Sequence, residues 1–318
     1  MRRVGVVGDG VVGERVVRRL PLAIPDVEIV TVDPRRWTSA DVEHCDVVVL
    51  ATSAPHASRA ADLLAVGIPT VSVSDRLDDV RALTDLDDAA RNADVPLVVG
   101  AGMSPGLTGL LARYLASRMA SVDEIHVAVH GTAGPSCARE QHRALAGLAV
   151  GWHDGAWIRR PAGSGRELCF FPEPVGGYDC YRAEMASPIL LHASFPQASR
   201  ISARVSANRR DRFTSWLPML SPPHREGGVG AVRVEVRGSA SDGSRTTQIL
   251  GIAELVGTAT AATAVAFASA AIDRRLPAGV VRTADTGLDT LGLLHVIGEL
   301  GVRLQEFTGV PSVRRVAA

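Results

Sequence analysis

Three glycines near the N-terminus have the spacing of a phosphate-binding turn. The apolar run at residues 4–7 is followed by Gly8, Gly10 and Gly13, and a helical pattern begins at Val11. The first glycine permits a tight turn, the second lets a pyrophosphate approach the backbone, and the third lets the helix pack close to the strand. The helix N-terminus adds free N–H groups and a positive dipole end. We therefore expect a dinucleotide to bind at Gly8, Asp9, Gly10, Val11, Val12 and Gly13.

The end of the second expected strand bears on the choice of dinucleotide. Asp33 stands where a carboxylate accepts hydrogen bonds from the adenosine ribose, which favours NAD. Arg35 and Arg36 follow at once and offer the charge that would hold the 2′-phosphate of NADP. NAD and NADP therefore both remain possible cofactors, with NAD favoured.

Further polar loops follow the later strands. Thr52, Ser53, Ala54 and His56 come after an apolar run, and ligands of such sheets lie at the carboxyl ends of strands, so we expect these residues to contact the cofactor. For His56 itself, the start of a helix is the favoured interpretation. Asp75 after the fourth strand is interpreted first as a helix cap.

The loop after the fifth strand continues this series. Gly102 and Met103 are expected beside the cofactor. Ser104 can cap a helix whose first residue is Pro105, and it can also lie near a nicotinamide or substrate.

The middle of the chain carries the residues that would act on a substrate. His130 and His142 are the candidates for moving a proton near neutral pH. Arginine holds carboxylates, which makes the arginines and one tyrosine candidates for substrate binding. For each of these residues taken singly, an ordinary structural side chain is the favoured interpretation. The substrate-binding candidates here are Arg139, Arg143, Tyr178 and Arg182.

Composition narrows the possible functions. All 34 basic residues are arginine, so mechanisms that need a catalytic lysine are excluded. The net charge of zero argues against a nucleic-acid or anionic-membrane partner. The four cysteines form no C-x-x-C pair, and no metal site is expected. No apolar stretch has spanning length, which predicts a cytoplasmic protein.

Strand and helix patterns alternate through the first hundred residues. Strands are expected at residues 4–7, 27–32, 45–51, 68–73 and 96–99, and helices at 11–20, 57–66, 77–92 and 107–119. This order predicts an α/β fold with a doubly wound parallel sheet. A helix at 139–150 and strands near 125–130, 168–171, 200–205, 229–237 and 248–255 indicate an α+β region with a mainly antiparallel sheet. The almost uncharged helix 258–272 is expected to return to the first sheet, and a last helix to follow at 288–300.

The chain resembles the saccharopine dehydrogenase family, which includes carboxynorspermidine dehydrogenase. The resemblance rests on the glycine turn, on residues 71–75 and 100–107, and on the helix 260–271 with the segment 276–280. It implies a Rossmann domain interrupted by a substrate-binding and dimerisation domain. We expect boundaries of 1–122, 123–257 and 258–318, the last part returning to the Rossmann domain.

The resemblance also implies an activity. Family members reduce an imine, or oxidise the corresponding amine, with a nicotinamide cofactor. We therefore expect an NAD(P)-dependent oxidoreductase that acts on a C–N bond of a small substrate with carboxylate and amine or imine groups, as a homodimer. A carbonyl or amino-acid dehydrogenase, or a dinucleotide-binding sensor or scaffold without turnover, remains an alternative.

Overall fold

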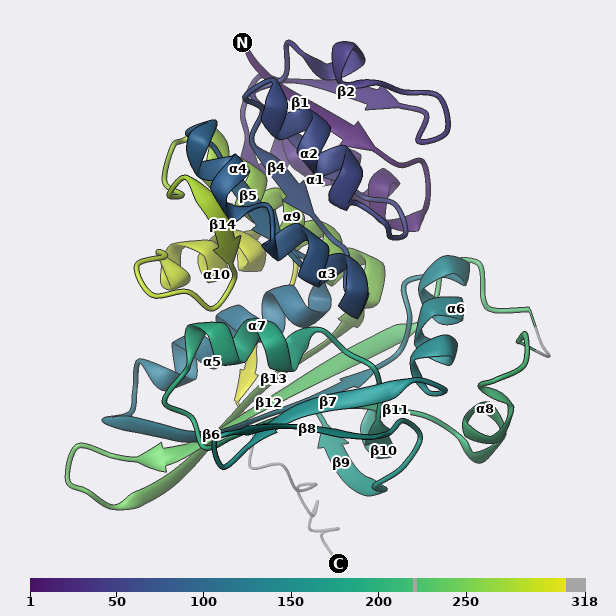
Figure 1. The fold of residues 1–318 in the computed structure, drawn as a ribbon, viewed down its shortest axis with the longest axis vertical. Coiled ribbons are helices and arrows are strands. Elements are labelled where there is room, and N and C mark those ends of the chain that lie inside the picture. The colour runs from purple at the N-terminus through teal and green to yellow at the C-terminus, as the bar shows by residue number, and fades with distance from the viewer. Residues whose placement is uncertain (220–221, 307–318) are drawn as a thin grey trace, which may run out of the picture.

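The computed structural model describes residues 1–219 and 222–306, and two sheets organise them (Figure 1). The first sheet has six parallel strands in the order β14-β5-β4-β3-β1-β2. Their bounds are β1 Arg2–Val7, β2 Val27–Val32, β3 Val47–Leu50, β4 Thr70–Ser72, β5 Pro96–Val99 and β14 Gly279–Arg282. This is the doubly wound parallel sheet that the alternation of strands and helices predicts.

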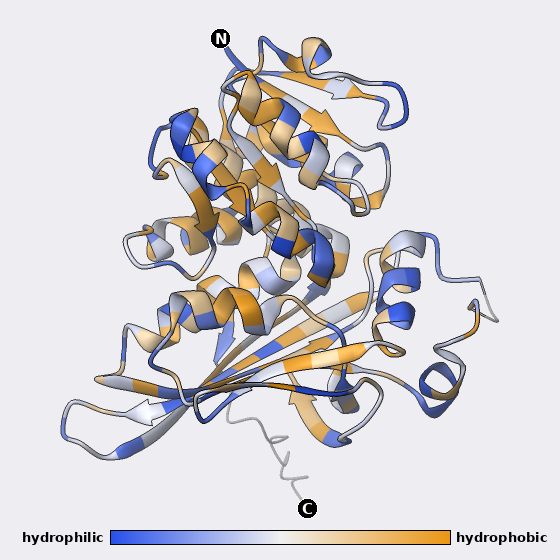
Figure 2. Cartoon of the chain, viewed as in Figure 1, coloured by the Kyte–Doolittle hydropathy of each residue, from blue (hydrophilic) through white to orange (hydrophobic). Residues whose placement is uncertain are grey.

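Helices cover both faces of this sheet, and the central strands are apolar on both sides for that reason. In β3, Val47 and Val49 belong to the core beneath α1 (Val11–Ala23) and α9 (Val256–Ile272). Val48 and Leu50 belong to the core on the opposite face. That face is covered by α2 Ala57–Ala65, α3 Leu77–Thr84 and α4 Asp87–Asn92. Most of the strand residues are strongly hydrophobic (Figure 2).

The second sheet is mixed and mainly antiparallel. Its order is β15-β13-β12-β6-β11-β10-β9, with the β7–β8 hairpin paired to β11, and β6 with β11 is its parallel pair. The bounds are β6 Ser121–His130, β7 Leu148–His153, β8 Ala156–Pro161, β9 Glu167–Phe171, β10 Gly176–Arg182, β11 Arg200–Ser206, β12 Val229–Ser239, β13 Arg245–Leu255 and β15 Gln305–Glu306. Helices α5 Thr108–Ala116 and α7 Ser187–Ser194 contact this sheet, and α6 Pro135–Ala144, α8 Arg209–Thr214 and α10 Thr290–Glu299 complete the helices of the described residues.

The helix α9 joins the two sheets. It follows β13 directly and packs beside α1, β3 and β4. No charged residue occurs between Val256 and Ile272, and nearly every residue of the helix is buried. A helix that is apolar on all sides belongs in a core, which confirms the expected return to the first sheet.

The structure corrects three of the expected elements. Residues 139–150 are not one helix, because α6 begins at Pro135 and Leu148 already belongs to β7. Gly147 lies in the turn between them, against Glu184, where a Cβ would clash. The expected helix 77–92 is divided into α3 and α4. The expected cap at Asp75 is also wrong, because the residue before α3 is Arg76, which makes no capping side-chain bond.

Candidate functional site

A cavity of about 960 Å³, here called the central cavity, lies where the first sheet faces part of the second. One side is formed by the loops that follow β1, β3, β4 and β5. The other side is formed by α6 and by the segment 183–187 that precedes α7. The chain passes from β1 out to β2 and then back to β3 on the other side of β1, so the crevice at the ends of β1 and β3 is the switch point where ligands bind in such sheets.

The glycine turn borders this cavity. Gly8 has φ +131°, and a Cβ there would lie 2.8 Å from the carbonyl oxygen of Ala51. A Cβ on Gly13 would collide with the carbonyl of Gly8, whereas a Cβ on Gly10 would meet nothing within 4 Å. Gly13 therefore serves the packing of α1, and Gly10 leaves open space beside the cavity.

The N-terminus of α1 points its donors at that space. Gly10 is the residue before the helix, and no side chain caps it. The first N–H groups of α1 therefore have no side-chain acceptor, and the helix dipole adds positive potential there. Of the six residues expected to bind phosphate, Gly8, Asp9, Gly10, Val11 and Val12 line the cavity, while Gly13 lies behind it.

The loop after β2 is arranged differently from the expectation. Asp33 does not line the cavity, and its carboxylate accepts the backbone N–H of Arg35 at 2.9 Å. Arg35 does line the cavity, and Arg36 does not. A second arginine, Arg59 of α2, also lines it and lies 5.0 Å above the ring of Trp37, another lining residue.

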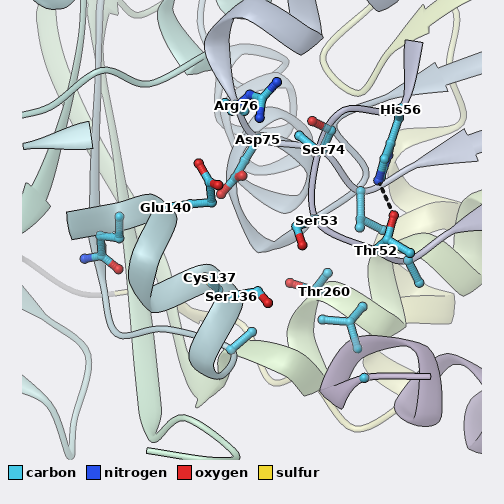
Figure 3. A pocket seen from close by; sticks show the side chains of 18 of the residues that line it. Thr52, Ser53, His56, Ser74, Asp75, Arg76, Ser136, Cys137, Glu140 and Thr260 are labelled. Atoms are coloured by element: carbon cyan, nitrogen blue, oxygen red, sulfur yellow. Dashed lines mark hydrogen bonds between the residues drawn. The ribbon is translucent and has the colours of Figure 1, made fainter. Parts of the chain in front are cut away.

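The loop after β3 is held by His56. Its side chain is 1% exposed, and Nε2 lies 2.9 Å from Oγ1 of Thr52 (Figure 3). Its Nδ1 lies 2.8 Å from Oγ of Ser72. The Asp79 carboxylate accepts the backbone N–H of His56. Burial lowers the pKa of His56 to about 4, although Asp79 opposes the shift. The ring is therefore neutral and fixes the loop, and Thr52, Ser53, Ala54 and His56 all line the cavity.

The loop after β5 is held by the buried helix α9. Thr260 of α9 accepts the backbone N–H of Met103 at 3.1 Å, and Oγ of Ser104 lies 3.1 Å from Oγ of Ser187. Gly102, Met103 and Ser104 line the cavity, as does Thr260. Ser104 is not a helix cap, because its extended backbone (φ −141°, ψ 130°) lies within the irregular turn Met103–Leu107 that precedes α5.

Polar side chains of α6 face Asp75 across the cavity. Figure 3 shows the carboxylates of Asp75 and Glu140 pointing toward each other, with Ser136 and Cys137 further along the helix. The Asp75 side chain is surrounded by protein, yet its own surface opens into the cavity. Burial and, to a smaller extent, the Glu140 charge raise the pKa of Asp75 to about 6, against a hydrogen bond with its own backbone.

The thiol beside them stays protonated. Burial and the charges of Asp75 and Glu140 raise the pKa of Cys137 to about 12. A thiol of this kind is a poor nucleophile at neutral pH. Cys137 is therefore part of the cavity wall and not a nucleophile at neutral pH.

The structure does not bring the two predicted catalytic histidines into the cavity. His130 lies on the opposite face of β6 from Val129, which lines the cavity, and its Nδ1 is 2.8 Å from Oγ of Ser206. His142 lies on the far side of α6, where Nε2 donates to the carbonyls of Thr214 and Leu217. The alternation of a strand and the turn of a helix aim both side chains away.

The predicted substrate-binding residues are also dispersed. The ring of Tyr178 lies against that of His130, with centroids 4.1 Å apart and planes tilted by 40°. Tyr178, Arg182 and Arg139 do not line the cavity. Arg143 does line it, but Nη1 donates to both carboxylate oxygens of Glu140, at 2.8 and 2.9 Å. Sequence reasoning did not single out Glu140, Ser136 or Cys137 for the site. Their helical spacing on one face of α6 was the available signal.

Among the described residues, no group of His, Cys, Asp and Glu is arranged to hold a metal ion, and no helix is both long and apolar enough to cross a membrane.

Comparison with known proteins gives likeness of fold alone. No family model and no curated protein matches the sequence. The apo saccharopine dehydrogenase (L-Glu forming) of Saccharomyces cerevisiae matches with a TM-score of 0.68 at 12% identity, over 96% of this chain and 100% of that chain.

Two further solved structures are similar. An engineered D-amino acid dehydrogenase bound to NADP⁺ matches with a TM-score of 0.52 at 17% identity, over 92% of this chain and 95% of that one. The amine dehydrogenase of Mycobacterium smegmatis matches with a TM-score of 0.51 at 14% identity, over 89% and 95%. The resemblance expected from the sequence is thus confirmed at the level of the fold: this chain has the Rossmann-type α/β architecture of saccharopine dehydrogenase.

Proposed function

We propose that this protein is an NAD(P)-dependent oxidoreductase that acts on a C–N bond, interconverting an amine and an imine. The observation that carries the proposal is the uncapped N-terminus of α1 at Gly10, which opens into a cavity whose far wall holds Asp75 and Glu140. The names of three solved structures with similar folds, a saccharopine, a D-amino acid and an amine dehydrogenase, support a reaction at nitrogen.

The lining residues fit a dinucleotide along the sheet edge. Gly8, Gly10 and the first N–H groups of α1 would hold the pyrophosphate. The loops at residues 52–56 and 102–104 would hold the nicotinamide half, and His56 and Thr260 keep them in place. When bound, the nicotinamide supplies the redox chemistry, and the protein supplies position and proton transfer.

Asp75 is the residue that we propose to transfer the proton. A carboxyl group with a pKa of about 6 is populated in both protonation states near neutral pH, which suits general acid–base catalysis. The ionised form would accept the proton that leaves nitrogen when an amine is oxidised, and the protonated form would return it. His130 and His142 have no part in this proposal because both lie outside the cavity.

The arginines at the other end of the cavity favour NADP over NAD. Arg35 and Arg59 line the cavity near Trp37, while the Asp33 carboxylate is occupied by the backbone of its own loop. Guanidinium groups bind phosphate well. We therefore propose a 2′-phosphate between Arg35 and Arg59, in place of the NAD preference that Asp33 suggested from the sequence.

Cofactor titration followed by turnover tests the function. Purified protein should quench or enhance NADPH fluorescence on binding, and should then oxidise NADPH only when an amine and a carbonyl compound are supplied together. Oxidation with the carbonyl compound alone would indicate a carbonyl dehydrogenase. Tight binding without redox change over a broad amine and carbonyl panel would indicate a sensor or scaffold. If the protein changes the fluorescence of neither NADH nor NADPH, the proposal is refuted.

A further inference from the structure

The end of the central cavity away from the glycine turn has an excess of carboxylates. We call it the acidic end: residues 74–78 after β4, the cavity face of α6, and residues 183–187. Its charged residues comprise four acids and two arginines. They are Asp75, Asp78, Glu140, Glu184, Arg76 and Arg143.

Both arginines of the acidic end are already paired. Nε of Arg76 donates to Asp78 at 2.6 Å, and Nη1 of Arg143 donates to both oxygens of Glu140. Each guanidinium charge is therefore already matched by one carboxylate, which leaves the other two carboxylates of the acidic end without a paired cation among the described residues. The net charge of the acidic end is therefore negative, which favours a cationic ligand group over a carboxylate.

Two carboxylates of the acidic end have no such partner. Within residues 1–219 and 222–306, no arginine or histidine forms an ion pair with Asp75 or Glu184. Asp75 opens into the cavity opposite Glu140 (Figure 3). The hydroxyls of Ser53, Ser136 and Thr260 line the same space and can accept hydrogen bonds.

We infer that the acidic end binds the ammonium group of an alkyl amine or diamine that lacks a carboxylate, with Asp75 as its acceptor. A ligand ammonium would neutralise the excess negative charge and donate to the surrounding oxygens. A carboxylate at the same place would add to an excess of negative charge, because the four acids outnumber the two arginines. The inference rests on the proposed function for its reaction, but it concerns recognition and can be tested by binding alone.

Matched ligands isolate the effect of one carboxylate. 1,4-Diaminobutane and ornithine differ only in that group, as do 1,5-diaminopentane and lysine. We expect calorimetric titration of the full chain, with and without NADPH, to show each diamine binding at least about tenfold more tightly than its amino-acid counterpart. Equal or tighter binding of the amino acids would overturn the inference.

Variants identify the site. Asp75→Asn should weaken diamine binding at least about tenfold, while Asp62→Asn, an exposed carboxylate on α2 outside the cavity, should change it less than about twofold. Asp78→Asn removes the ion-pair partner of Arg76 and should reduce the difference in affinity between a diamine and its amino-acid counterpart. Unchanged diamine binding in Asp75→Asn, with an unchanged melting temperature, would also overturn the inference.

The two proposals fail separately. Selective diamine binding by a protein that ignores both nicotinamide cofactors would refute the oxidoreductase and keep the acidic end as an amine site. Cofactor-dependent turnover of amino acids in preference to diamines would keep the oxidoreductase and refute the amine site.

Discussion

Gly10 and Gly13 show how two residues of one type serve different purposes within one turn. Gly13 is required by the fold, because a Cβ there would lie 2.0 Å from the carbonyl oxygen of Gly8. Gly10 has open space beside it and ordinary backbone angles of φ −89° and ψ −171°. The protein itself therefore has no steric need for a glycine at position 10. The proposed phosphate would need one, because a side chain there would occupy the space beside the backbone.

Alanine at each position separates folding from binding. Gly10→Ala should leave the free energy of unfolding within about 0.5 kcal/mol of the parent and weaken cofactor binding at least about tenfold. Gly13→Ala should lower the free energy of unfolding by about 2–4 kcal/mol, because a backbone clash displaces α1. Urea unfolding and fluorescence titration measure the two effects. Full cofactor affinity in Gly10→Ala would mean that no phosphate lies there.

The arginines near Trp37 give the test of cofactor choice. Arg35→Ala and Arg59→Ala should each weaken NADPH binding about tenfold and leave NADH binding nearly unchanged, because they remove a phosphate partner. Arg36→Ala is the matched control, since Arg36 lies next in sequence but outside the cavity. If the parent protein binds NADH more tightly than NADPH, Asp33 and not the two arginines determines the cofactor preference.

His56 predicts a pH dependence of stability. Burial favours its neutral ring, so the folded protein binds this proton less readily than the unfolded chain. The stability from the neutral ring is present above pH 6.5 and is lost as the pH falls toward about 4, by about 3 kcal/mol in all.

Replacement by a residue that does not titrate isolates this contribution. His56→Gln should be less stable than the parent by about 1–3 kcal/mol at pH 7, because hydrogen bonds to Thr52 and Ser72 are lost. The difference should shrink as the pH falls from 7 to 4.5 in urea unfolding. A difference that stays constant over this range would show that His56 does not titrate as described.

At the scale of elements, the helix α9 determines the shape of the loop after β5. It lies in the core between α1 and the sheet, and Thr260 is the point at which it contacts the cavity loop. The loop 102–104 therefore depends on a helix about 160 residues later in the sequence, because Thr260 of that helix accepts a hydrogen bond from the Met103 N–H.

Removing that acceptor tests the dependence. Thr260→Val keeps the shape of the side chain but leaves the Met103 N–H without its partner. We expect a loss of about 1–2 kcal/mol in the free energy of unfolding and a severalfold weaker binding of cofactor.

Thr263→Val is the control for this change. Thr263 is buried in the same helix, but its hydroxyl donates to the carbonyl of Ala259 in its own turn and does not reach the cavity. Its replacement should leave cofactor binding unchanged. Equal effects of both valines on cofactor binding would mean that Thr260 acts only through packing.

At the scale of the whole molecule, the two sheets share one core. A single cluster of buried residues extends from Val4 and Val47 of the first sheet through α9 to Val234 and Ile252 of the second. The division into 1–122, 123–257 and 258–318 stays a prediction, and residues 307–318 of its last part lie outside those described. The homodimer and the cytoplasmic location also stay predictions.

The continuous core predicts cooperative unfolding. Differential scanning calorimetry should show one transition, and NADPH at about 100 times its dissociation constant should stabilise the whole protein by about 2.7 kcal/mol. Two transitions, of which NADPH moves only the first, would show that the parts unfold independently in spite of their shared core.

The sequence by itself determined five of the six strands of the first sheet, all but β14, and the glycine turn that follows β1. These features depend on local order: an apolar strand, three glycines and a helix that follow one another within a dozen residues. The strands at 27–32 and 96–99 were predicted to the residue for the same reason, since each is a short valine-rich run that ends at a turn residue, Asp33 or Gly100.

Only the tertiary structure decided which polar side chains meet at the cavity. Asp75 and Glu140 are 65 positions apart. Asp75 follows β4 of the first sheet, and Glu140 belongs to α6, which follows β6 of the second sheet, so no local sequence pattern couples them. The side to which His130 and His142 point depends on strand alternation and on where α6 begins, and a shift of a few residues reverses it. Tertiary structure likewise decided that Arg143, predicted to bind a substrate carboxylate, forms an ion pair with Glu140.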